Sequence, residues 1–267
     1  MNELFLSYQS SQITPVSPYL EIFQIKKGVK AAHCMFEHVY FAHPSSKIEG
    51  RLVYDVRHKL GENLAREISK RRIDFDYVVP VPDSSRIAAQ AIAETLQKPL
   101  REAIVKNRYQ TSRVFILADL QRKKVIERKY LFVPSLIQNK RILLVDDSIV
   151  RGDTSRKLLV RLRKHNARWI GLASTCPPLI RPCYYGIDFS IDEELIARNK
   201  SLAELSNLIG ADEIFYQGIG DLIDAIGLEE KLCIACITGD YPTPGGRELR
   251  RKLSEGKLNP FITHYNQ

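Results

Sequence analysis

No apolar run in this 267-residue sequence approaches the roughly 18 residues that a membrane span needs. The first twelve residues, MNELFLSYQSSQ, lack the basic flank and the long apolar stretch of a secretory signal. Internal repeats and low-complexity tracts are absent as well. We therefore expect a cytoplasmic protein with no membrane segment, whose length suits one large α/β domain or such a domain with appendages.

Cysteine is also scarce, with five residues in the whole chain. Without an export signal these cysteines are not expected to form a disulfide framework, so we interpret their spacing in terms of metal ligands. Cys233 and Cys236 form a C-x-x-C pair, a pattern that zinc sites, redox sites and ordinary packing all produce.

Acidic residues are outnumbered by basic ones, 31 to 40, which gives a formal net charge of +9. Such an excess favours an anionic partner, either a phosphate-rich metabolite or a nucleic acid, although a basic solvated surface has the same composition. Aromatic residues do not alternate with the basic ones, as they would in a nucleic-acid platform. No DNA-binding motif is recognisable either, so we do not expect nucleic acid to be the partner.

Four apolar segments have the composition of buried strands, and helical patterns follow three of them. The strand segments are FDYVVPVP (75–82), RILLV (141–145), RWIGLAS (168–174) and EIFYQG (213–218). The helical patterns are Ile87, Ala88, Ala91, Ile92, Thr95 and Leu96; Leu158, Leu159 and Leu162; and DLIDAIG (221–227). This alternation predicts the α/β class, with a parallel sheet flanked by helices.

The ends of the chain differ from this pattern. Residues 1–30 carry two prolines and several serines with little periodicity, and we expect them to be an arm or linker. Residues 31–245 would form the domain. Residues 246–267 are basic and contain glycine, which suggests a peripheral tail.

The segment RILLVDDSIVRGDTS (141–155) places two acids directly after a predicted strand, where α/β proteins bind ligands. The turn that follows would present backbone N–H groups at the start of a helix, and Gly152 would let an anion approach closely. Thr154 and Ser155 can donate from their hydroxyls or cap the helix. Two carboxylates beside a phosphate cradle would repel the ligand unless they serve Mg²⁺ or sugar hydroxyls. A phosphorylated sugar fits all of these features.

A strand, two acids and a glycine loop also resemble the signature of phosphoribosyltransferases, which use 5-phosphoribosyl-1-pyrophosphate (PRPP). The form VDDSIVRG (145–152) resembles one family in particular, glutamine PRPP amidotransferase (amidophosphoribosyltransferase), which makes phosphoribosylamine for purine synthesis. Six further segments stand in the order of that family. They are CMFEHVYFAHP (34–44), VVPVPDSS (78–85), KNRY (106–109), PCYYGID (182–188), LIGAD (208–212) and CIACITGDYP (233–242).

The resemblance implies the type I phosphoribosyltransferase fold and assigns roles to the matching residues. Asp146 and Asp147 would bind the ribose hydroxyls and help position Mg²⁺, with Ser84 at a further metal position. Lys106 and Arg108 lie in the stretch that closes over PRPP and meets its pyrophosphate. The 5-phosphate would lie on Ser148, Ile149, Val150, Arg151, Gly152, Asp153, Thr154 and Ser155.

The resemblance also gives a role to four cysteines. Cys34, Cys183, Cys233 and Cys236 match the ligands of the 4Fe–4S cluster in cluster-bearing members of the family. The cluster would be structural and would tie the start of the domain to its end. A Cys₄ zinc site and a set of buried free cysteines remain alternatives. Cys176 lies outside the set and is expected in the core.

Several features depart from the family pattern. Only 33 residues precede Cys34, too few for the glutaminase domain with which the family begins, so we expect this chain not to hydrolyse glutamine by itself. A separate glutaminase subunit, use of free ammonia or another amine, and truncation are the three explanations. Asp153 replaces the usual threonine, and the lid KNRYQTSRVF (106–115) lacks the usual glycine. Closure of that lid is therefore expected to differ.

The leading hypothesis is an enzyme that forms phosphoribosylamine from PRPP and ammonia with Mg²⁺. A non-catalytic PRPP or nucleotide sensor is the alternative from another class, and transfer to a different amine is a third possibility. Members of the family are homo-oligomers, and we expect the same here from the resemblance alone.

Overall fold

The computed structural model describes residues 31–109 and 129–258, so the expected arm over residues 1–30 lies outside the described part. The strands are β1 (His33–Cys34), β2 (Lys47–Ile48), β3 (Arg51–Leu52), β4 (Tyr77–Pro80), β5 (Ile104–Lys106), β6 (Tyr130–Phe132), β7 (Arg141–Asp146), β8 (Trp169–Ser174), β9 (Glu213–Tyr216) and β10 (Leu232–Cys233). The helices are η1 (Glu37–Phe41), α1 (Val53–Lys70), α2 (Arg86–Thr95), η3 (Pro134–Leu136), α4 (Asp153–Lys164), η4 (Asp192–Glu194), α5 (Leu202–Ile209), α6 (Ile219–Ile226), η5 (Glu229–Lys231), α7 (Ala235–Thr238) and α8 (Pro244–Ser254).

The central sheet has the order β4–β7–β8–β9, and every neighbouring pair is parallel. The register aligns Val78 with Leu143, Leu143 with Gly171, and Gly171 with Glu213. These are the four strands predicted from the sequence. Because the strands are parallel, their carboxyl ends meet at one edge of the sheet, and the loops that follow them converge there.

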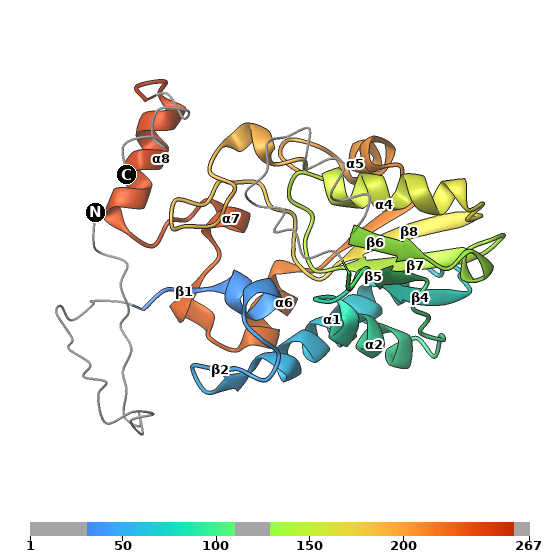
Figure 1. The fold of residues 1–267 in the computed structure, drawn as a ribbon. Helices are drawn as coiled ribbons and strands as arrows, with labels where there is room; N and C mark the ends of the chain where they lie inside the picture. Colours follow the sequence, from blue (N-terminus) through green and yellow to red (C-terminus); the bar gives the residue numbers. More distant parts are fainter. Residues whose placement is uncertain (1–30, 110–128, 259–267) are drawn as a thin grey trace.

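Helices cover both faces of this sheet, as predicted (Figure 1). Successive strand residues point to opposite faces, so Val78 packs with α1 and α2 whereas Val79 packs on the side of α4 and α5. On the first face α1 and α2 approach very closely. A Cβ added at Gly61 would lie 2.4 Å from the Ala88 carbonyl oxygen, so this contact requires glycine.

The helices follow from local sequence signals. Apolar residues of α1 recur at helical spacing and are buried: Val53, Val56, Leu60, Leu64 and Ile68. Helix α5 begins with a capping box, in which Ser201 and Glu204 each bond the other's backbone N–H, and it ends at Gly210 in the left-handed conformation. Helix α4 has no side-chain cap at its first residues.

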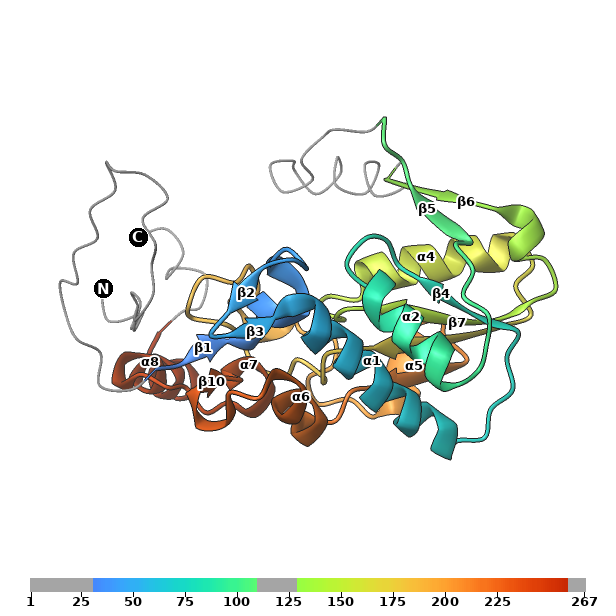
Figure 2. The same ribbon diagram turned by 90° about the horizontal axis from the view of Figure 1, so that it is seen from below.

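A second region lies at one end of the sheet and is built from distant parts of the chain (Figure 2). Strands β1 and β10 pair in parallel, and a separate apolar cluster joins them to α6 and α7. Helix α8 follows and spans the boundary expected at residue 245. No helix within the described ranges is long and apolar enough to cross a membrane.

Candidate active site

Asp146 and Asp147 lie where β7 ends, at the carboxyl edge of the central sheet. Both are buried, each with 7% of its surface exposed. Asp146 Oδ1 accepts hydrogen bonds from the Asp147 N–H at 3.0 Å and from the Ser85 hydroxyl at 3.4 Å. Asp147 accepts hydrogen bonds from the hydroxyls of Ser84 and Ser148. The structure therefore brings Ser84, from the loop after β4, onto the predicted acid pair.

Burial is the main influence on the ionisation of this acid pair. It raises the pKa of Asp146 well above the ordinary aspartate value, and the charge of Asp147 raises it further. Burial also raises the pKa of Asp147, although two serine hydroxyls and the positive charges of Arg57 and Lys129 oppose the rise. A cation or a pair of sugar hydroxyls bound at the carboxylates would favour their ionised form.

The predicted phosphate loop turns directly from the acid pair into α4. Gly152 has a φ of 76°, in the left-handed region, and a Cβ there would lie 2.5 Å from Ile196 Cδ1. The backbone N–H groups of the first turn of α4 have no side-chain cap. Because such N–H groups and the helix dipole attract anions, the start of α4 is suited to a phosphate.

The side chains of the loop do not all face the place where a phosphate would lie. Ile149 is 2% exposed and belongs to the core of the domain. Arg151 Nη2 donates to the Asp188 carbonyl at 2.9 Å and to Glu194 Oε1 at 2.8 Å. These two residues are therefore restricted to backbone contacts with a ligand, and Arg151 fixes the loop to the segment after β8. Asp153 opens α4 with an exposed side chain.

The two predicted cations of the lid lie on and after β5. Lys106 Nζ forms an ion pair with Asp83 Oδ2 at 2.7 Å, and Asp83 belongs to the loop that carries Ser84. Lys106 therefore lies against the loop that carries Ser84, and its predicted contact with pyrophosphate stays a prediction. Arg108 is exposed, two residues further along. The rest of the predicted lid, residues 110–115, lies outside the described residues.

Three further residues interact electrostatically with the acid pair and were not predicted from the sequence. The charges of Asp146 and Asp147 act on Lys129, whose pKa is lowered by burial and by Lys106. They also raise the pKa of Tyr40, after the effect of burial. Arg57, on α1, acts on Asp147 from the protein interior. No spacing in the sequence distinguishes Lys129 from the basic residues around it, so only the fold places it here.

The four predicted cysteine ligands gather in the second region of the fold. Cys34 and Cys233 are register partners in the β1–β10 pair, and Cys236 follows on α7. Backbone N–H groups point at the sulfur atoms: Tyr185 donates to Cys183 Sγ at 3.4 Å. The electrostatic neighbours of Cys236 include the other three predicted ligands. The structure thus brings all four together from three distant segments.

Burial raises the pKa of the Cys34, Cys233 and Cys236 thiols, that of Cys34 to about 12, so burial alone favours the neutral form of these three thiols. Within the described ranges, no group of three or more histidine, cysteine, aspartate or glutamate side chains is arranged to hold a metal ion. A single zinc ion needs ligands that converge on one point, whereas each thiolate of a 4Fe–4S cluster binds a different iron. Cys176 is fully buried, as expected for a core residue.

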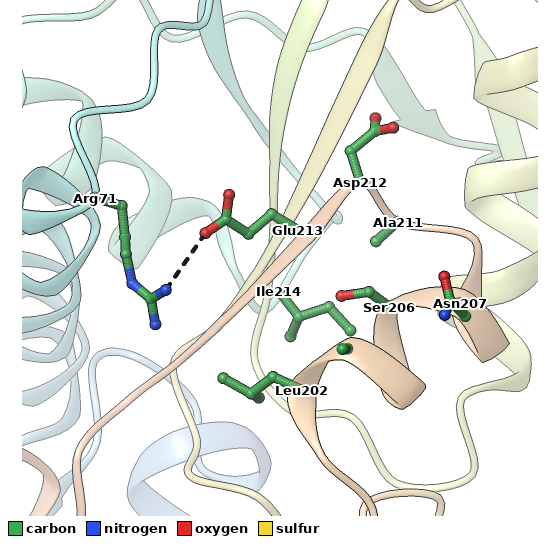
Figure 3. A pocket seen from close by; sticks show the side chains of 9 residues that line it. Arg71, Leu202, Ser206, Asn207, Ala211, Asp212, Glu213 and Ile214 are labelled. Atoms are coloured by element: carbon green, nitrogen blue, oxygen red, sulfur yellow. Dashed lines mark ion pairs between the residues drawn. The ribbon is translucent and has the colours of Figure 1, made fainter.

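The structure also has a surface hollow of about 290 Å³ (Figure 3). It is lined by residues of α5 and the start of β9, with Arg71 and Glu213 paired at 3.9 Å on one side. Since β9 runs parallel to β7, the start of β9 lies at the opposite edge of the sheet from the acids. This hollow is therefore separate from the candidate active site.

Comparison with known proteins places this geometry in a class. Residues 55–186 match the phosphoribosyl transferase domain family, a range that includes the acid pair and the phosphate loop. The solved glutamine PRPP amidotransferase from B. subtilis, complexed with ADP and GMP, superposes with a TM-score of 0.71 and 38% sequence identity. That match covers 84% of this chain and 49% of the other. The chain therefore carries a phosphoribosyltransferase domain with the predicted type I fold.

Curated relatives indicate which phosphoribosyltransferases the chain is similar to. The chain is 44% identical over 239 residues to amidophosphoribosyltransferase from Methanocaldococcus jannaschii, covering 89% of this chain and 49% of that protein. It is 39% identical over 222 residues to amidophosphoribosyltransferase from Bacillus subtilis, covering 81% and 46%. The chain thus spans about half the length of the curated relatives that it matches. These matches confirm the predicted resemblance to the amidophosphoribosyltransferase family.

Proposed function

We propose that this chain transfers the phosphoribosyl group of PRPP to ammonia and forms 5-phosphoribosylamine, the reaction that opens purine synthesis. The observation that carries the proposal is the buried acid pair, Asp146 and Asp147, which leads directly into the uncapped start of α4. One end of this arrangement suits ribose hydroxyls and the other suits a phosphate. The similarity to amidophosphoribosyltransferases supports the choice of product.

In the proposed complex the 5-phosphate lies on the backbone of residues 148–155 and the ribose hydroxyls meet the two carboxylates. Lys106, which pairs with Asp83, and Lys129, which interacts electrostatically with the acids, would meet the departing pyrophosphate. The bond from C1 to the pyrophosphate oxygen breaks, a bond from C1 to nitrogen forms, and the attacking ammonia gives up a proton. Catalysis would come mainly from positioning and from stabilising the charge on the leaving group.

Mg²⁺ is the cofactor that this donor set suits, because Mg²⁺ prefers oxygen ligands and shares its coordination with substrate phosphates. Asp146, Asp147 and the Ser84 hydroxyl would hold it or its water ligands. When bound, the ion would neutralise part of the charge on the departing pyrophosphate. Burial raises the pKa of both carboxylates, and a bound cation would shift them back toward their ionised form.

We further propose that Cys34, Cys183, Cys233 and Cys236 hold a structural 4Fe–4S cluster. Four cysteines are the usual ligand set, and the N–H group of Tyr185 directed at Cys183 Sγ resembles the hydrogen bonds that tune such clusters. When bound, the cluster would tie β1 to β10 and so would join the start of the domain to its end. It would take no part in phosphoribosyl transfer.

The nitrogen source is tested by product analysis. Purified protein with PRPP and Mg²⁺ should release pyrophosphate when ammonium is added, and glutamine should replace ammonium only if a glutaminase is supplied. Turnover with another amine but not with ammonium would refute the proposed acceptor. Tight binding of PRPP without turnover by any amine would instead support the regulatory alternative. Light scattering of the same sample tests the expected homo-oligomer.

A further inference from the structure

Arg57 is a buried arginine of α1 that the reaction as described does not use. Only 4% of its surface is exposed, and no carboxylate within the described ranges forms an ion pair with it. Its Nε donates to the His38 carbonyl at 2.9 Å. Its Nη2 donates to the carbonyls of Tyr40 and Ala42, at 2.8 and 2.9 Å. All three acceptors belong to one short segment, residues 38–42.

That segment is the end of η1, a single π-helical turn, and the residue that follows it. The last carbonyls of a helix lack partners within the helix, and the dipole makes that end negative. A guanidinium that binds three such carbonyls satisfies them with charge-assisted hydrogen bonds in a buried setting. Lysine has no planar fork and could not reproduce the same three contacts. The local geometry of residues 38–42 therefore depends on Arg57.

Residues 38–42 lie close to the acid pair, since Val150 of the phosphate loop packs against the apolar cluster that contains Val39. Tyr40 is 41% exposed; burial and then the charges of Asp147 and Asp146 raise the pKa of its hydroxyl, whereas Lys106 lowers it. In Figure 2 the blue segment between β1 and β2 lies against the start of α1. Arg57 thus connects helix α1 to the short turn that carries the Tyr40 ring near the acid pair.

We propose that Arg57 is a positioning residue of the PRPP site: it holds residues 38–42 so that Tyr40 forms a fixed wall beside the acid pair. The inference rests on the proposed function, because the acids must be the place where PRPP binds. Arg57 does not touch the substrate: it acts through this segment, and its charge also acts on Asp147. An arginine that only stabilises the fold would lower the melting temperature but would leave the kinetics of the folded enzyme unchanged.

The test uses the full chain with Arg57→Gln and Arg57→Lys. Arg51→Gln is the matched control, because Arg51 Nη2 also donates to a backbone carbonyl, that of Gly227 at 2.8 Å, away from the acids. We expect kcat with ammonium to fall on the order of 100-fold in Arg57→Gln, as a displaced wall would cause. Arg57→Lys should recover part of this loss, because it keeps the charge and one or two of the contacts. Arg51→Gln should keep the parent kcat.

Hydrogen exchange gives a readout that does not depend on turnover. Peptides that cover residues 36–44 should exchange about tenfold faster in Arg57→Gln than in the parent or in Arg51→Gln, because strong buried hydrogen bonds are lost. Calorimetry should show weaker binding of PRPP with Mg²⁺ in the same variant. Unchanged exchange, or faster exchange with unchanged kcat and PRPP affinity, would overturn the inference.

The two proposals can fail separately. If the parent binds PRPP but does not turn it over, the proposed reaction is wrong, and the PRPP affinities of the Arg57 variants still decide the inference. If the parent does not bind PRPP at all, both proposals are refuted. If Arg57→Gln does not fold, the decision rests on Arg57→Lys, which should show intermediate exchange and an intermediate kcat.

Discussion

Asp147→Asn separates the chemistry of the acid pair from its structural role. Asparagine has nearly the shape of aspartate, and its side-chain oxygen can still accept a hydrogen bond from the hydroxyl of Ser84 or Ser148. The variant loses the charge that would hold a cation and the sugar. We expect kcat/KM for PRPP to fall on the order of 10²- to 10³-fold, about 2.7–4 kcal/mol of transition-state stabilisation.

We expect the same variant to be more stable than the parent at neutral pH. Folding raises the pKa of both Asp146 and Asp147, so the folded protein binds these protons more tightly than the unfolded chain does. The pair therefore favours folding at low pH, and stability falls as pH rises above the unfolded value of about 4 and through the raised folded values. Asp147→Asn removes one of the two charges at neutral pH, so the variant should lose less stability as the pH rises. Each 1 kcal/mol gained would raise Tm by about 2–4 °C.

The assay is pyrophosphate release from PRPP with ammonium, together with thermal unfolding at pH 5 and pH 8. Asp76→Asn is the control, because the exposed Asp76 carboxylate accepts the Arg141 N–H at 2.8 Å at the opposite edge of the same sheet. It should keep the parent activity and change stability by less than about 0.5 kcal/mol, because asparagine can still accept this hydrogen bond. Parent-level activity in Asp147→Asn would show that the site is assigned wrongly. A fall in Tm alongside the lost activity would refute the electrostatic reasoning.

Three further predictions concern the remaining parts of the site. Protein purified without oxygen should be brown, with iron and sulfide near four each per chain, and Cys233→Ser should lose both; colourless protein with one zinc would reverse the assignment. Gly152→Ala should lower stability by about 1–2 kcal/mol because of its left-handed φ, and further because the new Cβ contacts Ile196. It should also weaken PRPP binding. Gly210→Ala has a similar φ in open space and should show only the loss of stability due to the backbone. Lys129→Met should raise KM for PRPP about 10- to 100-fold without lowering Tm, and an unchanged KM would remove Lys129 from the site.

The central sheet could be predicted from the sequence because its strands are buried on both faces. Continuous apolar runs such as residues 142–145 are then easily recognised, and the alternation with helices predicts the parallel topology. The short strands β1 and β10 carry no such signal. Each has only two residues, and their pairing depends on bringing residue 34 beside residue 233. Tertiary packing decides such contacts, and sequence periodicity does not report them.

Some residues of the candidate site could likewise be predicted from the sequence, whereas others could not. The acid pair and its loop are contiguous, so a motif could reveal both the residues and the strand that presents them. Arg57, Tyr40 and Lys129 reach the pair from three other segments, and each looks like an ordinary helix or surface residue in the sequence. The sequence also could not show that the Ile149 side chain packs in the core and that the Arg151 side chain binds Glu194, because both residues lie inside the matching motif.

The burial of the acid pair is itself an argument about function. A protein selected only for stability would not keep two adjacent carboxylates at 7% exposure, where each disfavours the ionised form of the other. The serine hydroxyls satisfy some of their oxygens, and the positive charges of Arg57 and Lys129 offset part of the repulsion. The carboxylates therefore keep some unbalanced negative charge. Beside them lies the uncapped start of α4, whose N–H groups and dipole attract an anion. A ligand with hydroxyls and a metal at one end and a phosphate at the other satisfies both at once, and a neutral or purely cationic ligand does not.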